Sequence, residues 1–246
     1  MTYGFLPATK EEFDRSGIGV PDFVYVSGDA YVDHPSFGAA IITRILDAAG
    51  FSVAVLAQPN FRSTEDFMRY GKPRLGFLVS SGNVDSMVAH YTAAKKKRSD
   101  DWYSPGRRAG LRPDRAVIVY TNRIREAYGD IPVIIGGLEA SLRRFAHYDY
   151  WSDKVRRSIL VDSRADILSY GMGENSIRRI AELLARGVPV KKIRDVRGTA
   201  YLCRRGEKLN FDPVRGTREE PEGYDYDELK TSKAAYAAAF AEQYAN

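Results

Sequence analysis

Small and polar residues follow four apolar runs of the sequence, at the points where the runs end. These runs are 22–26, 74–80, 132–135 and 166–170. In open parallel sheets, ligands bind beyond the carboxyl ends of the strands, and glycine there lets the backbone approach a ligand closely. The residues that follow the runs therefore form a candidate binding rim: Gly28, Asp29, Asp33, His34, Ser81, Asn83, Gly136, Gly137, Glu139, Ser141, Gly171, Gly173 and Glu174. Turns between strands and helices also need glycine and cap residues, so a purely structural role is the alternative.

The segment 171–176 invites comparison with G-x-G-x-x-G, the phosphate-binding fingerprint of dinucleotide-binding proteins. Ser176 stands where the third glycine belongs, and the segment follows the last of the apolar runs rather than the first. The carboxylate of Glu174 would also compete with a phosphate for the free N–H groups of the first helical turn. We therefore do not expect a bound dinucleotide.

The pair Asp33 and His34 lies in the loop after the first apolar run. Cobalamin-binding α/β domains often carry D-x-H-x-x-G in this loop, where the histidine replaces the lower axial ligand of cobalt. Here no residue separates Asp33 from His34, and three residues separate His34 from Gly38. We interpret His34 as a turn residue, and cobalamin binding through it stays open as an alternative. The other histidines, His90 and His147, are not paired at helical spacing, so a histidine metal site is not expected.

Residues 95–112 combine seven basic side chains with Trp102 and Tyr103, as nucleic-acid readers can. Asp100 and Asp101 interrupt the basic run. We interpret the segment as a solvated loop and expect at most weak, sequence-independent nucleic-acid binding. A basic nucleic-acid-binding module stays open as the second alternative.

The composition excludes several classes of protein. A single cysteine, Cys203, excludes an internal disulfide framework and any metal site built from several thiolates of this chain. Because its neighbours 200–202 are largely apolar, we expect a buried structural thiol. The 37 basic and 32 acidic residues nearly balance, and no apolar stretch approaches the 18 residues of a membrane span. With no signal-like start, the expectation is a soluble, cytoplasmic, globular protein without a membrane partner.

Alternating apolar runs and helical patterns predict an α/β fold. We expect a doubly wound, parallel, five-stranded sheet, because right-handed crossovers place helices on both faces. Its strands are 22–26, 52–56, 74–80, 132–135 and 166–170, and its helices are 37–49, 64–70, 84–94, 114–128 and 174–186. Residues 138–165 resist assignment.

The composition changes near residue 190, which predicts a domain 1–190 followed by an arm over 191–246. In that arm we expect a hairpin of 196–203 with 208–211, a linker over 212–225 and a helix over 226–244.

Six segments carry a resemblance to a known family, in order along most of the chain. They are 5–7, 28–38, 80–88, 112–116, 135–144 and 170–174. They resemble the amino-terminal region of the YgiQ-type radical SAM proteins. In that family, a cobalamin-binding-type α/β domain precedes a barrel with a C-x-x-x-C-x-x-C motif, whose thiolates hold a [4Fe–4S] cluster that binds S-adenosylmethionine.

The resemblance implies a radical SAM enzyme of unknown substrate, small or macromolecular, in which this domain docks on the barrel. The cysteine motif is absent here, so the chain resembles a fragment or truncation that ends before the barrel. The cluster and S-adenosylmethionine are then implied for the full-length protein only. We expect no cofactor, metal or catalytic residue in this chain, and no activity of the chain alone.

Overall fold

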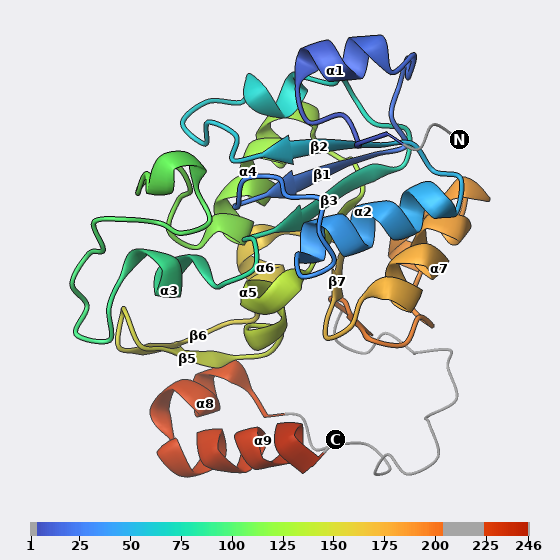
Figure 1. Ribbon diagram of the computed structural model, residues 1–246. Helices are drawn as coiled ribbons and strands as arrows, with labels where there is room; N and C mark the ends of the chain where they lie inside the picture. Colours follow the sequence, from blue (N-terminus) through green and yellow to red (C-terminus); the bar gives the residue numbers. More distant parts are fainter. Residues whose placement is uncertain (1–3, 204–223, 246) are drawn as a thin grey trace. The chain divides into compact units, whose positions relative to one another are not determined.

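The computed structural model describes residues 4–203 and 224–245 (Figure 1). The chain divides into two compact units. The first consists of Met1–Arg144 and Ile159–Leu202, and the second of Phe145–Ser158 and Cys203–Asn246. The boundary near residue 190 was predicted from composition alone. The structure instead joins residues 145–158 to the carboxyl-terminal segment and leaves residues up to 202 with the first unit.

The first unit is built on a mixed sheet whose strand order is β2-β1-β3-β4-β7-β8. The first five of these strands run parallel to one another, which confirms the predicted parallel sheet. From β1 the chain goes first to β2 on one side and then to β3 on the other, so the direction in which strands are added reverses there. β1 and β3 therefore flank the position where open α/β sheets bind ligands. The strands are β1 (Phe23–Ser27), β2 (Val53–Ala57), β3 (Gly76–Ser80), β4 (Val133–Ile135) and β7 (Ile167–Ser169).

The sixth strand, β8 (Thr199–Ala200), corrects the predicted hairpin. It pairs antiparallel with β7 at the edge of the sheet, where Leu168 faces Ala200. A two-residue strand cannot be separated from an extended loop by sequence pattern, and its neighbour in the sheet is far away in the chain. The proposed partner strand 208–211 and most of the linker over 212–225 lie outside the described residues.

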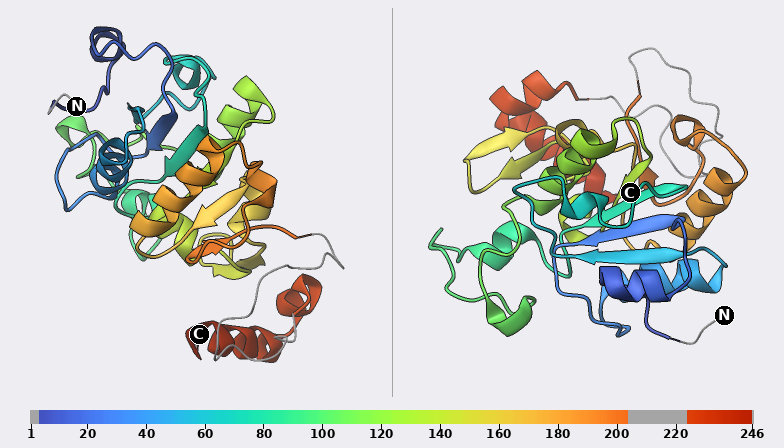
Figure 2. Two further views of the ribbon diagram at one scale, coloured as in Figure 1. Left: turned by 90° about the vertical axis from the view of Figure 1, so that its right-hand side faces the viewer. Right: turned by 90° about the horizontal axis from the view of Figure 1, so that it is seen from above.

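Helices cover both faces of this sheet (Figures 1 and 2). Alternate strand residues supply two cores because successive side chains point to opposite faces. Val24 and Val79 pack with Tyr120 and Ile124 on one face, whereas Phe23 packs with Leu46 and Ile180 on the other. The helices are α1 (Lys10–Arg15), α2 (Gly38–Ala48), α3 (Ser86–His90), α4 (Ala116–Tyr128), α5 (Gly137–Leu142), α6 (Ile159–Ser163) and α7 (Glu174–Ala185). The doubly wound arrangement predicted from the sequence is confirmed.

Two predicted helices are shorter than their patterns indicated. The helix expected over 84–94 ends at His90, because Tyr91 pairs with Lys97 in an isolated β-bridge. The helix expected over 64–70 is reduced to a 3₁₀ turn, η1 (Asp66–Met68). Further 3₁₀ turns are η2 (Pro105–Arg107) and η3 (Val190–Lys192).

The second unit pairs a hairpin with two helices. The hairpin consists of β5 (His147–Asp149) and β6 (Lys154–Arg156), in the segment that resisted assignment. The helix expected over 226–244 is divided into α8 (Tyr226–Thr231) and α9 (Lys233–Ala245), because Ser232 has extended backbone angles. A small core joins these elements: Leu229, Ala235 and Ala239 are buried and pack with Ala146 and Val155. Among the described residues, no helix is long and apolar enough to cross a membrane.

Candidate functional site: a cavity at the carboxyl edge of the sheet

A cavity of about 260 Å³ lies at the carboxyl ends of β3, β4 and β7. The start of α2 and the start of α7 form its sides, and both helices cover the same face of the sheet. Its wall is mainly aliphatic, and the side chains involved are Ile41, Ile42, Leu78, Ile134 and Ile177. Such an enclosure suits an apolar group of roughly ring size, because ligand pockets are mostly lined by apolar side chains.

Glycines keep this cavity open. Gly136, Gly137, Gly171 and Gly173 from the predicted rim all line it. At Gly173 an added Cβ would lie 3.1 Å from the Ser169 hydroxyl oxygen. Gly137 has a φ of +80°, which side-chain-bearing residues rarely adopt, and a Cβ there would lie 3.3 Å from that of Ser80. Space and backbone conformation therefore both favour glycine at this edge.

The uncharged polar side chains that line the cavity, those of Tyr25, Ser80 and Ser169, carry hydroxyls. Tyr25 donates a hydrogen bond of 3.0 Å to the Ser80 Oγ, and burial raises the pKa of Tyr25 to about 12. The hydroxyls of Ser169 and Ser176 lie 2.6 Å apart. Glu174 is the charged residue among those that line the cavity, and no cation lines it. The arrangement suits a neutral group better than a phosphate, because the lining offers a carboxylate and no cation.

The strand order reverses between β1 and β3, and this switch point of the sheet is filled by the protein's own side chains. The Arg112 Nη1 lies 2.8 Å from the Asp29 Oδ1, and its Nη2 lies 2.8 Å from the Asp101 Oδ2. Arg112 also donates to the Ser81 carbonyl at 3.0 Å, and all three charged side chains are buried. A buried ion pair needs such additional hydrogen bonds, because removing each charge from water costs several kcal/mol.

The pKa values of the two carboxylates of this triad are shifted in opposite directions. Burial raises the pKa of Asp29 to about 6, against the opposing effect of Arg112. Burial acts in the same sense on Asp101, but hydrogen bonds from Arg112 and the Tyr103 N–H outweigh it and lower the pKa of Asp101. Asp101 therefore keeps its negative charge beside Arg112 to lower pH, whereas Asp29 gains or loses its proton near pH 6.

Tight backbone packing explains other rim residues beside the triad. A Cβ on Gly28 would lie 2.1 Å from the Ser81 carbonyl oxygen, and one on Gly82 would lie 2.0 Å from the Asp29 Oδ1. Asn83 donates its N–H to the Asp29 Oδ2 at 2.6 Å. At Gly28, Asp29, Ser81 and Asn83 the chain's own loops occupy the space that a ligand would need.

Glu139 is a buried carboxylate at two helix starts and not a cavity residue. It accepts hydrogen bonds from the Ser86 N–H at 2.9 Å and the Val117 N–H at 3.0 Å, at the first turns of α3 and α4. Burial raises the pKa of Glu139, and the nearby Asp85 adds to the effect. Ser141, another predicted rim residue, accepts at its carbonyl from the Arg144 side chain at 2.9 Å.

The loop with His34 is held by its own hydrogen bonds. Asp33 pairs with Arg44, whose Nε lies 3.0 Å from the Asp33 Oδ2. His34 is exposed, and its Nδ1 accepts the Ser36 N–H at 3.1 Å. The Asn83 amide donates to the Ser36 carbonyl at 3.2 Å and ties this loop to the end of β3. These contacts match the interpretation of His34 as a turn residue.

Two expectations about single residues were wrong. Asp101 and Arg112 were assigned to a solvated loop, yet both are buried in the triad. Their sequence separation carries no recognisable signal, because the pairing depends on how the loop folds back over β3. Cys203 was expected to be buried and is exposed, since it follows the edge strand β8 rather than lying inside a strand.

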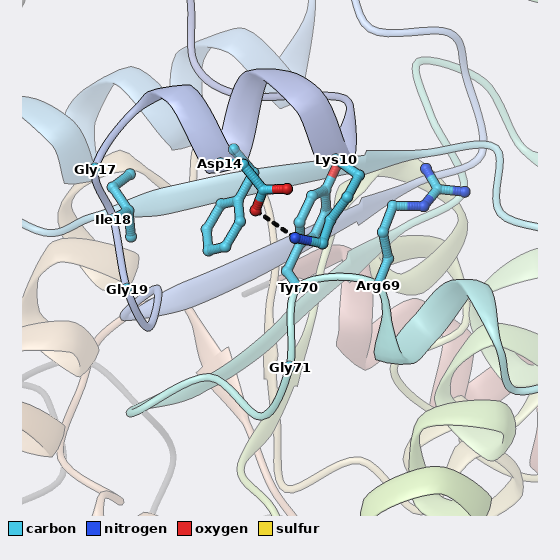
Figure 3. Close-up of a pocket in the computed structure, with 9 residues that line it drawn as sticks. Lys10, Asp14, Gly17, Ile18, Gly19, Arg69, Tyr70 and Gly71 are labelled. Atoms are coloured by element: carbon cyan, nitrogen blue, oxygen red, sulfur yellow. Dashed lines mark hydrogen bonds and ion pairs between the residues drawn. The ribbon is translucent and has the colours of Figure 1, made fainter.

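A second cavity lies beside α1, and Figure 3 shows its lining. Lys10 and Asp14, one turn apart on α1, form an ion pair at its edge, and Arg69 pairs with Asp66 at 2.7 Å. The Tyr70 hydroxyl donates to the Val55 carbonyl at 3.0 Å. Because these side chains already have partners within the protein, this cavity offers a ligand few free polar groups and the carboxyl-edge cavity is the stronger candidate.

The chain does not supply ligands for an iron–sulfur cluster. Its sequence has one cysteine, whereas clusters are held by several thiolates. Within residues 4–203 and 224–245, no group of three or more histidine, cysteine, aspartate or glutamate residues is placed to hold a metal ion.

Comparison with known proteins identifies the family. A UPF0313 protein of Clostridium botulinum is 56% identical over 240 residues, which cover 98% of this chain and 36% of that protein. The UPF0313 protein YgiQ of Escherichia coli is 57% identical over 200 residues, which cover 81% of this chain and 27% of that protein. The chain thus spans about a third of the length of these relatives.

A solved structure also matches part of the chain. It is the radical S-adenosylmethionine methyltransferase TsrM from Kitasatospora setae, bound to tryptophan and a SAM analogue. The match has 18% identity and a TM-score of 0.49, and it covers 75% of this chain and 29% of that one. The family described as Radical SAM N-terminal matches residues 5–246. The chain therefore belongs to the Radical SAM N-terminal family and is an N-terminal region of the UPF0313 type, as its motifs predicted.

Proposed function

We propose that the carboxyl edge of this α/β domain docks on the catalytic domain of a radical SAM protein and that its cavity holds an apolar part of the substrate. The [4Fe–4S] cluster and S-adenosylmethionine would then belong to the catalytic domain, because this chain cannot supply the thiolates. The relatives are about three times as long as the matched region, which leaves room for such a domain.

The observation that carries the proposal is the apolar mouth of the cavity. Met172 lines the cavity and is 87% exposed. Leu138 and Leu142 follow Gly137 on α5, are four residues apart on one helix face and are both exposed. Scattered exposed leucines are ordinary, but Leu138 and Leu142 lie on the helix that begins at the lining residue Gly137, and exposed apolar side chains next to a cavity support an interaction surface.

The lining limits the chemistry of the bound group. A neutral ring or branched alkyl group would contact Ile42, Leu78 and Ile134, while the hydroxyl of Ser80 or Ser169 could accept or donate one hydrogen bond. Anionic groups are disfavoured, because Glu174 stands at the cavity without a cationic partner in its lining. The cavity therefore fits a partner that presents an uncharged end to this domain.

The test compares the chain alone with a full-length chimera. In the chimera, this chain replaces the matching third of the Clostridium botulinum relative, with which it shares 56% identity. Hydrogen exchange of 137–142 and 170–174 is measured in both. We expect these segments to be strongly protected in the chimera, and we expect Leu142→Asp or Met172→Asp to remove that protection.

A matched control separates docking from general destabilisation. Val20 is exposed and precedes β1, so Val20→Asp adds the same charge at the amino edge of the sheet. It should leave the protection of 137–142 unchanged. Equal exchange of both segments in the chain and the chimera would show that this edge stays exposed. A stand-alone cobalamin-type binding module would then be the better explanation.

A further inference from the structure

The connection between α3 and α4 is an ordered, strongly basic loop. Two isolated β-bridges, Tyr91 with Lys97 and Asp100 with Arg108, fold residues 91–108 into two short turns. The Arg98 N–H donates to the His90 carbonyl at 2.7 Å, and the Asp101 N–H donates to the Arg107 carbonyl at 2.9 Å. The loop therefore presents its side chains from a defined backbone.

The two fully exposed stretches of this loop carry charge of a single sign. Residues 93–99 and 105–110 are exposed, and neither stretch contains an aspartate or glutamate. They carry Lys95, Lys96, Lys97, Arg98, Arg107 and Arg108. The sequence suggested that Asp100 and Asp101 dilute this charge. Asp101 is instead buried and pairs with Arg112, so it does not offset the exposed cations. Asp100 is half-buried and leaves a single partly exposed negative charge beside six exposed basic residues.

An exposed aromatic ring lies within the basic surface. Trp102 is 69% exposed, although buried Asp101 directly precedes it. The Arg107 guanidinium stacks over the indole ring, with its central carbon 3.7 Å from the ring centroid. An indole with a stacked guanidinium offers a flat, cationic platform of the kind on which unpaired bases stack.

The loop is fixed to the edge of the sheet that carries the cavity. The Ala30 N–H, three residues after the end of β1, donates to the Tyr103 carbonyl at 2.9 Å. Arg112 joins Asp101 of the loop to Asp29 of the β1 turn. Figure 1 shows the loop in green beside α3, on the side to which the β1 and β3 arrows point.

We propose that this loop is a binding surface for single-stranded nucleic acid. The lysines and arginines would pair with consecutive phosphates, and one base would stack on Trp102 beside Arg107. A membrane surface fits less well, because interfacial segments bury a broad apolar face and the exposed stretches hold only small and basic residues besides Trp102. The loop contains none of the residues that line the carboxyl-edge cavity.

The test measures the affinity of the 246-residue chain for a labelled oligouridylate of about 15 nucleotides by fluorescence anisotropy. We expect binding at about 150 mM salt that weakens as salt rises. The triple variant Lys95→Glu, Lys96→Glu, Lys97→Glu should bind at least about tenfold more weakly. Its salt slope should be smaller by about 2, since each phosphate contact on a single strand contributes about 0.7.

Variants of Trp102 test the stacking contact. Trp102→Ala should weaken binding by about tenfold, and Trp102→Phe should retain most of the affinity, because base stacking needs an aromatic face. The sequence has two tryptophans, so in a Trp151→Phe background the fluorescence of Trp102 should be quenched by the oligonucleotide. Quenching would place a base at the ring, which charge attraction alone would not do.

The control reverses the same number of charges elsewhere. Arg178, Arg186 and Lys192 are exposed on and after α7, and their triple change to glutamate should leave binding nearly intact. Equal loss in both triple variants would reduce the effect to net charge and overturn the proposal. So would an unaltered affinity in Trp102→Ala, equal binding of a duplex, or tighter binding to anionic lipid vesicles. An oligothymidylate of equal length distinguishes DNA from RNA as the preferred strand.

Discussion

Arg112 and Asp29 form an ion pair of 2.8 Å at the position where open α/β sheets usually bind a ligand. Asp101, on the loop before α4, completes the pair from the other side of the guanidinium. The protein therefore closes its switch point with its own charges. The space left for a ligand lies one strand further along, over the ends of β3, β4 and β7.

Removal of the central cation should strongly destabilise the fold. In Arg112→Met the side chain keeps its bulk, but Asp29 and Asp101 remain buried without their partner. Breaking a buried ion pair in this way costs about 3–5 kcal/mol. Urea unfolding of Arg112→Met and of Arg74→Met checks this. Arg74 is largely exposed where it pairs with Asp22, so its loss should cost at most about 1 kcal/mol. Equal costs would contradict the central role of Arg112.

Asp29 should make stability fall as pH rises. Burial raises its pKa from 3.8 to about 6 in the folded chain, so the folded state holds a proton that the unfolded state has lost. This contribution is complete at low pH and disappears as pH rises through about 6. Asp101, whose pKa is lowered, acts in the opposite direction at lower pH.

The comparison with Asp29→Asn isolates the Asp29 contribution. The free energy of unfolding is measured for both proteins between about pH 4 and pH 7.5. The wild type should lose stability relative to Asp29→Asn as pH rises from about 4 to about 6, and the difference should then level off. A constant difference over this range would mean that Asp29 ionises normally in the folded protein.

Gly28 should tolerate no side chain. In Gly28→Ala the new Cβ would lie 2.1 Å from the Ser81 carbonyl oxygen, so the backbone of β1 or β3 must shift. Overpacking of this kind costs about 1–3 kcal/mol. Gly38 is the matched control, because a Cβ there meets no atom within 4 Å and Gly38 begins α2. Gly38→Ala should be neutral or slightly stabilising in thermal unfolding, as alanine favours helices.

The parallel strands could be predicted because each is an apolar run closed by small or polar residues. Both faces of β1 are buried, for example, and its sequence Phe23 to Ser27 shows no alternation. The hairpin of β5 and β6 had no such pattern. Its strands have three residues each, Tyr148 is exposed, and its core partners Leu229 and Ala235 come much later in the chain.

The sequence located the carboxyl edge but not the roles of its residues. Glu174 and Asp29 both follow a strand and look alike as acidic turn residues. Glu174 lines the cavity, whereas Asp29 is held by Arg112. The difference arises from the loop before α4, whose fold depends on two isolated β-bridges that no local sequence pattern predicts. The sequence alone therefore does not tell whether such a residue contacts a neighbouring loop or lines a cavity, and the structure is needed to distinguish the two roles.

The cavity should bind a small neutral aromatic molecule, and filling it should prevent binding. Indole is a suitable probe because it is flat, uncharged and small enough to enter a cavity of about 260 Å³. Titration should shift the methyl NMR signals of Ile42, Ile134 and Ile177, which line the wall. In Ala39→Phe the new ring would enter the cavity from α2 and occupy this space. Ala185→Phe, on the exposed end of α7, is the control and should leave the shifts unchanged. If indole shifted these methyl signals equally in Ala39→Phe, its binding site would lie elsewhere and the cavity would lose its place as the ligand site.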